Sequence, residues 1–511
     1  MSLAESLKTE HFDEVKALLE KNGPLDIENL VFEGGGAKGM FYIGVIKVLE
    51  DLGLLSRMKR FGGTSVGSIA AGVLAVGGTT KDVEKIFVEG NVAKLVYDSK
   101  GGKMSLIPNV IKKFGWNPAD KLLKTIYTYF KEKVGNPEIT FMELYKLRGV
   151  ELCTVASNLS TMTPEYCHVK TTPDMCVARA IRSSASLPGI MQPVKINRDG
   201  VEEILVDGAL VCNFPLHCYD GWFLSMKKED SFFHRLGGTE PAFSEFNPKT
   251  LGVALFSALD MRLMKGELLS NAFVGPKRPN TKLANSRAKC CDKAIESYAK
   301  SNQLYDAGNR FLLGLREADL DRDGEISIQE FRDAFVDNKL LSDEDGKMLF
   351  GDDFDIETAF TQIDTDADGL LTSDEFLSFM QKRGVAYRAI MTGGGSFTSV
   401  KDFSSFFASV FNTISVWTGQ AFAHPRDMER TLGVFTDYIR VTDFIMEHDD
   451  KCFALKVGME TTLKYIASRI GKSIGERPPT ANPVNDSVAA NTEPKSTDDL
   501  EGAVGGEIAV N

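Results

Sequence analysis

A serine flanked by glycines is the strongest candidate for chemistry in this sequence. Ser65 is the centre of Gly63-Thr64-Ser65-Val66-Gly67, a G-x-S-x-G pattern that follows a short segment ending at Phe61 and precedes small residues from Ile69 to Val76. A nucleophile in this pattern sits on a tight strand-to-helix turn, and the glycines two residues to either side remove Cβ atoms that would clash there. Ser65 is therefore predicted to attack a carbonyl carbon.

A glycine-rich loop, Glu33 to Gly39, comes one strand earlier in the chain. It lies between an expected strand and an expected helix, so its backbone N–H groups can point together at an anion. That anion is either a cofactor phosphate or the oxyanion formed when an ester carbonyl is attacked. Gly34, Gly36 and Gly39 also satisfy G-x-G-x-x-G, but the acidic residue typical of dinucleotide sites is missing after the second strand.

The nucleophile needs a base, and the sequence offers a histidine or an aspartate. Of the six histidines, His217 is the best candidate, whereas His168 fits a packed or exposed strand residue better. Asp207 is more persuasive, because it ends the apolar run Leu205-Val206 and is followed by Gly208. We expect its carboxylate at the carboxyl edge of a parallel sheet, the edge where Ser65 lies. An ordinary Asp-Gly turn is the alternative.

Strands and helices that alternate along the chain must position these groups. The pattern of a short apolar strand, a glycine turn and a helix occurs twice between Asn29 and Val76, which predicts a parallel sheet and an α/β fold. Further strands are predicted at 150–155, 204–206, 250–256 and 431–441, and a last helix near 451–468.

Four motifs in this order resemble the patatin-like phospholipase family. They are the glycine loop, the G-x-S-x-G at Ser65, the stretch from Ser183 to Pro188, and Asp207-Gly208-Ala209, and the resemblance covers roughly residues 26–275. It implies an α/β fold in which a parallel-sheet sandwich carries helices on both faces. Lys38 stands where the family usually has arginine.

The resemblance also implies a Ser-Asp dyad. Asp207 would take the proton of Ser65, an acyl-enzyme would form, and water activated by the same carboxylate would release a fatty acid. The backbone amides of Gly34, Gly35 and Gly36 would hold the oxyanion.

Two twelve-residue stretches, 319–330 and 364–375, match the calcium loop of an EF-hand. Each has acidic residues at positions 1, 3 and 5, glycine at position 6 and glutamate at position 12. Ile326 and Leu371, at the eighth positions, are predicted to pair across a short strand. Two Ca²⁺ ions are expected, and an acidic loop without metal is the alternative. The expected ligands are Asp319, Asp321, Asp323, Glu325 and Glu330 in the first loop and Asp364, Asp366, Asp368, Leu370 and Glu375 in the second.

Composition excludes some partners. A net charge of −12 over 511 residues argues against nucleic acid, which is bound by concentrated lysine and arginine. The sequence has no run of about 18 apolar residues, so no transmembrane helix is expected. The eight cysteines form no C-x-x-C pattern and fit reduced thiols in a cytoplasmic protein. We expect it to reach a phospholipid surface as a peripheral protein.

The chain divides into five predicted parts. They are an amphipathic helix (1–25), the patatin-like domain (26–275), an all-α EF-hand pair as an insertion (285–385), a closing part of the hydrolase domain (386–470) and a disordered tail (471–511). Within the closing part, an aromatic stripe between Phe403 and Trp417 fits a buried core helix, or otherwise a lid or an interfacial face.

The leading hypothesis is a lipid acyl hydrolase of the phospholipase A type, regulated or stabilised by calcium. The alternative is a calcium-dependent membrane or signalling adaptor on an inactive hydrolase scaffold. The intact Ser65, Asp207 and glycine loop argue against inactivity. A nucleotide-binding oxidoreductase would leave the Gly63–Gly67 pattern unexplained.

Overall fold

The computed structural model describes most of residues 2–471. The undescribed positions up to 399 are 90–91, 199, 236, 258–274, 319–322, 337–341, 384 and 386–399. Between 401 and 425, the described residues are Phe406, Ser409, Val410, Thr413, Ile414, Thr418 and His424. The predicted aromatic helix therefore falls largely outside the described residues, and the predicted tail falls outside them beyond Gly471.

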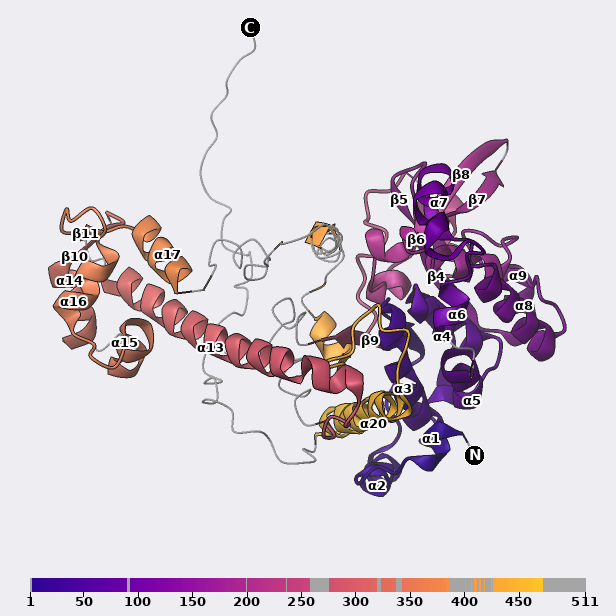
Figure 1. Ribbon diagram of the computed structural model, residues 1–511, viewed down its shortest axis with the longest axis horizontal. Helices are drawn as coiled ribbons and strands as arrows, with labels where there is room; N and C mark the ends of the chain where they lie inside the picture. The colour runs from indigo at the N-terminus through magenta and orange to yellow at the C-terminus, as the bar shows by residue number, and fades with distance from the viewer. Residues whose placement is uncertain are drawn as a thin grey trace, which may run out of the picture. The chain divides into compact units, whose positions relative to one another are not determined.

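A mixed sheet, dominated by parallel strands, forms the centre of the fold (Figure 1). Its strand order is β12-β9-β1-β2-β4-β8-β7, and β5 pairs with β4 beside this path. The first five strands run parallel, whereas β8, β7 and β5 are antiparallel to their neighbours. This confirms the predicted α/β class. The strands are β1 (Asn29–Phe32), β2 (Arg60–Thr64), β4 (Glu151–Asn158), β5 (Thr163–Cys167), β7 (Val194–Arg198), β8 (Val201–Asp207), β9 (Thr250–Phe256) and β12 (Thr431–Phe435).

The two faces of the sheet are covered differently. Alternate side chains of a strand point to opposite faces, so Leu30 and Phe32 enter a large core with the long helices, while Val31 enters a smaller one. The smaller core is closed by residues 211–224, which include the 3₁₀ turn η6 (Leu216–Tyr219). The helices of the large core include α3 (Met40–Asp51), α4 (Val66–Ala75), α8 (Asp120–Val134), α9 (Phe141–Arg148), α10 (Val177–Ser184) and α20 (His448–Arg469).

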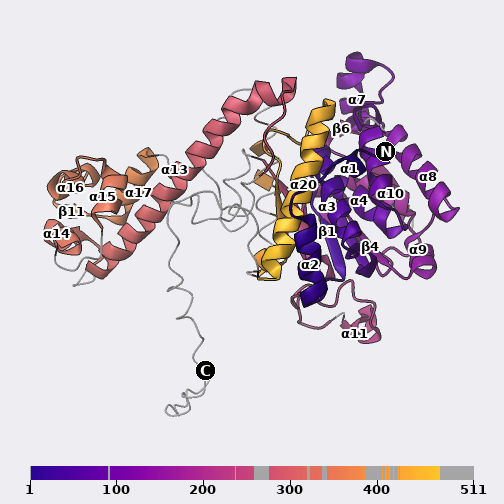
Figure 2. The ribbon, with the colours of Figure 1, turned by 90° about the horizontal axis from the view of Figure 1, so that it is seen from below.

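Helix α20 lies alongside α3 (Figure 2). Gly44 of α3 makes this possible, because a Cβ atom there would lie 2.0 Å from the carbonyl oxygen of Leu455. The strand β12, which precedes α20, pairs with β9 and ends at Phe435, so it is shorter than the predicted 431–441. Thr436 N still donates to Phe256 O at 2.7 Å, but Asp437 then adopts a positive φ of 49° that turns the chain away.

The N-terminal segment forms two helices instead of the single one predicted. They are α1 (Leu3–Ser6) and α2 (Phe12–Asn22), and they bury Ala4 and Val15 in the large core. Helix α1 begins at its Ser2 cap, and the Ala4 N–H donates to the Glu84 carboxylate at 3.1 Å. The break comes at Leu7, whose backbone is extended (φ −92°, ψ 135°). The other short elements on this part of the chain are α5 (Thr80–Glu84), α6 (Val92–Val96), α7 (Leu106–Lys113), α11 (Phe232–Arg235), β3 (Gly115–Asn117) and β6 (Gly189–Met191).

A second hydrophobic core belongs to the two EF-hands. Phe311, Phe331, Phe360 and Phe376 are all buried in it. Ile326 pairs with Leu371 in a two-stranded antiparallel sheet, which confirms the predicted link between the loops. The elements are α13 (Lys282–Ala318), β10 (Ile326–Ser327), α14 (Ile328–Val336), α15 (Asp343–Phe350), α16 (Ile356–Ile363), β11 (Leu370–Leu371) and α17 (Ser373–Lys382).

Helix α13 contributes to both cores. Its first half places Ala284 and Cys291 in the large core, and its second half places Ala307 and Phe311 in the EF-hand core. Among the described residues, no helix is both long and apolar enough to cross a membrane.

Candidate active site

Ser65 occupies a sharp turn between β2 and α4. Its backbone has φ 53° and ψ −124°, a region that residues with a side chain rarely adopt. A Cβ atom on Gly63 would lie 2.5 Å from the carbonyl of Gly67, and one on Gly67 would lie 2.5 Å from Phe32 O. The two flanking glycines are thus required because backbone segments meet on both sides of the serine, as the sequence pattern predicted.

Hydrogen bonds hold the turn in this conformation. The backbone N–H of Ser65 donates to Ser184 Oγ at 2.9 Å, and that hydroxyl donates to Val155 O at 2.5 Å. Ser68 Oγ donates to the carbonyl of Ser65 at 2.6 Å. The strained residue is therefore fixed from α10, from β4 and from its own helix.

Asp207 contacts the serine directly, since Ser65 Oγ donates to Asp207 Oδ2 at 2.7 Å. The route to this contact differs from the prediction, because β8 is antiparallel to β4 and does not extend the parallel set. Strand β4 runs past the end of β2: Thr64 lies opposite Val155, and Asp207 lies opposite the next residue, Ala156. Strand β8 pairs with this overhang and ends at the level of Ser65.

The Asp207 carboxyl is buried, with 1% of its surface exposed. Burial raises its pKa to about 7, against the opposing influence of hydrogen bonds from Ser65 and the Ala209 amide and of the Arg182 charge. Arg182 is itself buried and donates to Pro118 O at 2.8 Å and Gln192 O at 2.9 Å. Asp207 is therefore poised to exchange a proton near neutral pH.

The glycine loop lies beside the turn, but its amides differ in what they can do. Gly34 N donates to Asn213 O at 2.9 Å, and Ala37 N donates to Val441 O at 2.8 Å. Among the described residues, the amides of Gly35 and Gly36 have no partner. The expectation that Gly34 donates to an oxyanion is thus corrected, because its N–H group is already engaged.

Gly34 is needed for a different reason. A Cβ atom on it would lie 2.3 Å from Asn213 Oδ1 and 3.2 Å from Ser65 Cβ. The Asn213 amide also donates to Glu33 Oε1 at 3.0 Å and to Gly34 O at 3.2 Å. Asn213 therefore fastens the glycine loop to the segment that follows Asp207.

The two histidines that the sequence raised lie elsewhere. His217 is buried in the smaller core with its Nε2 2.7 Å from the Tyr166 hydroxyl, and burial lowers its pKa to about 3. His168 is buried with its Nε2 3.1 Å from Glu151, and it lies directly after β5, not in a strand as predicted. The partner of Ser65 is Asp207.

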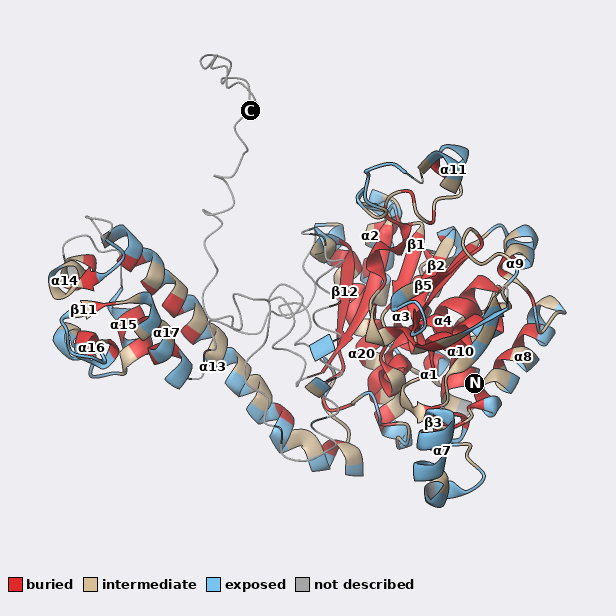
Figure 3. Cartoon of the chain, turned by 90° about the horizontal axis from the view of Figure 1, so that it is seen from above, coloured by how far each residue is buried: buried red, intermediate tan, exposed pale blue. Residues whose placement is uncertain are grey.

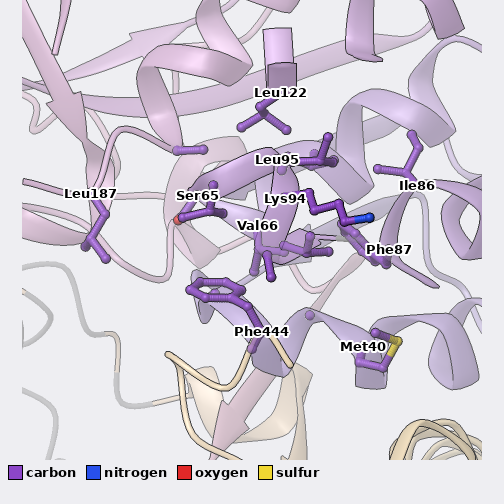
Figure 4. Close-up of a pocket in the computed structure, with 18 of the residues that line it drawn as sticks. Met40, Ser65, Val66, Ile86, Phe87, Lys94, Leu95, Leu122, Leu187 and Phe444 are labelled. Carbon is purple, nitrogen blue, oxygen red and sulfur yellow. The ribbon is translucent and has the colours of Figure 1, made fainter. Parts of the chain in front are cut away.

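Ser65 and Asp207 open into an apolar cavity of about 460 Å³ (Figure 4). This volume lies in the range of small-molecule sites. The wall is built from the glycine loop with α3, from α4, from residues 86–88 and 92–96, from the stretch between Ala185 and Met191, and from the loop before α20. Leu122 of α8 and Lys451 of α20 complete it. Its apolar side chains include Met40, Val66, Ile69, Ile86, Phe87, Val88, Val92, Leu95, Leu122, Leu187, Met191, Phe444, Ile445 and Met446.

The second EF-hand loop is arranged to hold a cation. Ligand oxygens of Asp364, Asp366 and Asp368 lie within 4.8 Å of one another. Asp364 Oδ1 is buried and has no hydrogen-bond partner among the described residues. A desolvated carboxylate oxygen without a partner fits a missing ligand bond.

The twelfth position supports the same fit. Hydrogen bonds from Thr372 and Thr365 outweigh burial and lower the pKa of Glu375 to about 2, so its carboxylate is charged. Gly369 adopts a φ of 86° at position 6 of this loop, and Gly324 a φ of 85° in the first. Asp319 and Asp321 lie outside the described residues, whereas Asp323, Glu325 and Glu330 are described at the entry to β10 and α14.

Sequence reasoning missed three residues of this site. Asn213 and Arg182 carry no motif, because their roles arise from contacts with segments far away in the chain. Ser184 lies in the Ser183–Pro188 stretch that the motif comparison singled out, but its bond to the Ser65 amide could not be foreseen.

Comparisons with known proteins agree with this arrangement. The family model described as patatin-like phospholipase matches residues 30–218, and the EF-hand model matches 314–336 and 356–380. The uncharacterized protein YqhO of Bacillus subtilis is 30% identical over 39% of this chain and 67% of its own length. The probable lipid hydrolase 463L of Invertebrate iridescent virus 6 is 26% identical over 38% of this chain and 63% of its own length.

A solved structure aligns more widely but more weakly. VipD from Legionella pneumophila is 14% identical, with a TM-score of 0.38, over 87% of this chain and 67% of its own. The chain thus spans about two thirds of the length of each of these relatives.

Burial of the Asp207 carboxyl predicts how the stability of the protein changes with pH. Because its folded pKa of about 7 lies above its ordinary value of 3.8, the folded state holds this proton more tightly than the unfolded state does. The resulting stability is fully present below about pH 4 and is lost as pH rises towards 7, by up to about 4 kcal/mol. Asp207→Asn should therefore gain thermal stability relative to wild type between pH 5 and pH 8, as measured by calorimetry. Glu20→Gln, an exposed change on α2, serves as the control. A difference that stays constant with pH would contradict the high pKa.

Proposed function

Because the chain belongs to the patatin-like phospholipase family, we propose that it is a lipid acyl hydrolase that cleaves fatty-acyl esters of phospholipids through a Ser65-Asp207 dyad, under the control of calcium. One observation carries the proposal: Ser65 Oγ lies 2.7 Å from a buried carboxylate at the wall of an apolar cavity. A relative named as a probable lipid hydrolase supports the substrate class.

The proposed mechanism has two halves that use the same base. Ionised Asp207 accepts the hydroxyl proton as Ser65 Oγ bonds to the ester carbonyl carbon, and it returns that proton to the departing alcohol oxygen. A water molecule then loses a proton to Asp207 as its oxygen bonds to the acyl carbon. The bond between that carbon and Ser65 Oγ breaks, Asp207 returns the proton to Oγ, and the fatty acid leaves. The amides of Gly35 and Gly36 stabilise the oxyanion in both halves.

The cavity supports a fatty-acyl substrate. Nearly all its side chains are aliphatic or aromatic, so it offers an acyl chain an environment without competing hydrogen bonds. Among the described residues that line it, the cationic side chains are those of Lys94 and Lys451. They can face the phosphate of a phospholipid that enters with its acyl chain first.

The calcium ligands are proposed as a set. In the first loop Asp319, Asp321, Asp323 and Glu330 offer carboxylates and Glu325 its carbonyl; in the second, Asp364, Asp366, Asp368 and Glu375 offer carboxylates and Leu370 its carbonyl. Calcium, when bound, would draw these oxygens together and fix the helices that flank each loop. The first of those helices is α13, which ends at Ala318, one residue before Asp319.

The other end of α13 contacts the loop that borders the active site. Arg287 forms an ion pair with Asp443 and donates to Tyr438 O at 2.9 Å. Arg278, just before the helix, donates to Asp437 Oδ1 at 2.9 Å. Both aspartates lie in residues 436–447, the stretch between β12 and α20, which we call the clamp loop.

The clamp loop touches the catalytic machinery at two places. Its Val441 carbonyl accepts the Ala37 amide of the glycine loop at 2.8 Å. Its residues Phe444, Ile445 and Met446 line the cavity. A shift of α13 can therefore change both the setting of the oxyanion amides and the shape of the acyl site, which is how we propose that calcium acts.

Replacement of the nucleophile tests the central claim. Ser65→Ala should lower fatty-acid release from phospholipid vesicles by at least about a thousandfold, because the acyl-enzyme cannot form. Ser56→Ala, an exposed serine outside the cavity, is the matched control and should stay near wild type. Activity that survives in Ser65→Ala would remove the proposal.

The rate should depend on pH in a defined direction. Only ionised Asp207 can accept the serine proton, and its pKa is raised to about 7, so kcat/KM should rise with pH through about 7 and then level off. The measurement uses a soluble short-chain ester, so that changes in a lipid surface do not enter. A profile that is flat from pH 5 to pH 9 would argue against Asp207 as the base.

The calcium route makes a separate prediction. Wild type should differ in fatty-acid release by several-fold between calcium and a chelator, and Glu330→Gln with Glu375→Gln should remove the difference. Arg278→Ala with Arg287→Ala should reduce the difference while calcium binding, measured by calorimetry, stays intact, because both links to the clamp loop are cut and the EF-hand loops are untouched. Lys289→Ala, an exposed change on the same helix, is the control. An undiminished calcium response in the double arginine variant would refute this route.

A further inference from the structure

Residues 97–114 expose a concentration of large apolar side chains. Met104 is 92% exposed, Ile111 70% and Ile107 67%. Helix α7 buries none of its residues, and Figure 3 shows it in pale blue beside β3. The exposed side chains, which we call the α7 patch, are Tyr97, Met104, Leu106, Ile107, Ile111 and Phe114.

The α7 patch lies on one side of a helix whose other side is hydrogen-bonded to the rest of the protein. Met104, Ile107, Ile111 and Phe114 follow each other by three or four residues, so in and beside α7 they lie on the same side. The opposite side is anchored, because Asn109 Nδ2 donates to Trp116 O at 2.9 Å and Trp116 Nε1 donates to Gly102 O at 3.0 Å. The chain thus holds these apolar side chains outward by hydrogen bonds.

The patch continues into the cavity. The Tyr97 ring lies edge-on to Phe444, with centroids 6.0 Å apart, and Phe444 lines the cavity. Strand β3, at the foot of α7, pairs with β6, whose Met191 also lines the cavity. Ile445, another lining residue, is 84% exposed. Apolar surface therefore extends from the site of chemistry to α7.

The charge of the residues around the α7 patch indicates what kind of surface it contacts. Residues 92–119 contain five lysines and one carboxylate, Asp98, in a chain whose net charge is −12. Asp98 accepts the backbone amides of Ala119 at 2.9 Å and Lys121 at 3.2 Å. Among the lysines whose side chains are described, Lys94, Lys100, Lys112 and Lys113 are all exposed.

We infer that the α7 patch is the surface by which this protein docks on an anionic lipid bilayer. An apolar helix face bordered by lysines enters the headgroup region and attracts negatively charged lipids. The inference rests on the proposed function for its purpose, since docking here brings the cavity to the surface that holds its substrate. An acyl chain then moves from the bilayer into the cavity along apolar side chains.

Binding is tested without catalysis. The full-length Ser65→Ala protein is sedimented with vesicles of phosphatidylcholine, with and without phosphatidylserine. It should bind the phosphatidylserine vesicles more tightly, and added salt should weaken that binding. Ile107→Ser with Ile111→Ser should weaken it by at least about tenfold. Lys112→Glu with Lys113→Glu should weaken it by about tenfold or more on the anionic vesicles.

The control uses a similar surface on another helix. Lys146→Glu with Leu147→Ser changes an exposed lysine and an exposed apolar residue on α9 and should leave binding unchanged. Circular dichroism melts confirm that each variant folds. A failure of Ser65→Ala to bind anionic vesicles, or wild-type binding by both α7 variants, would overturn the inference. Dimers in sedimentation velocity that the isoleucine changes dissolve, without vesicle binding, would assign the patch to a second copy of this chain.

Hydrolysis separates this inference from the proposed function. With Ser65 intact, the α7 variants should turn over a soluble short-chain ester at the wild-type rate and lose activity only on vesicles. Loss of turnover on the soluble ester as well would mean that the changes damage the active site, and would overturn a role limited to docking. Turnover that does not need Ser65 would refute the mechanism, yet the vesicle experiment would still decide the docking surface.

Discussion

The close approach of backbone segments around Ser65 is the constraint on which this structure depends. Glycine at 34, 63 and 67 leaves no Cβ atom where one would lie 2.3 to 2.5 Å from a neighbouring atom. A side chain at 63 or 67 would push the backbones of β1, β2 and α4 apart, and one at 34 would displace the Asn213 side chain. Two hydrogen bonds hold Ser65 at its positive φ: its N–H donates to Ser184 of α10, and its carbonyl accepts from Ser68 of α4.

The same compactness sets the chemistry of the carboxylate. Strand β8 ends inside the structure, so Asp207 loses its water and binds its proton more tightly. Arg182 and the Ala209 amide restrain the rise in pKa. A carboxylate with an ordinary pKa would be a weaker base than Asp207. A carboxyl buried without Arg182 and the Ala209 amide would stay protonated at neutral pH. Because Asp207 is buried, the folded state loses stability above about pH 4, and this loss is the cost of the base that we propose.

Local motifs predicted the proposed nucleophile and base and the EF-hand loops, but not how distant segments meet. Ser65 and the pairing of Ile326 with Leu371 follow from a few neighbouring residues, so the sequence was sufficient for their local structure. The direction of β8 could not be predicted, because either direction leaves an aspartate at the end of an apolar run. From the sequence alone, Gly34 could be an oxyanion donor or a glycine that leaves room for a neighbouring group. The contact with Asn213, 179 residues away in the chain, decides between the two.

The clamp loop is where the calcium and lipid proposals meet. Asp443 is held by Arg287 of α13, and the next residue, Phe444, contacts Tyr97 of the α7 patch while lining the cavity. Because Phe444 directly follows Asp443 in the chain, the displacement of Asp443 that we propose for calcium binding would also shift the Phe444–Tyr97 contact. Docking that fixes Tyr97 in turn restricts Phe444. By linkage, any effect of calcium on lipid binding through this loop requires an equal effect of lipid on calcium binding.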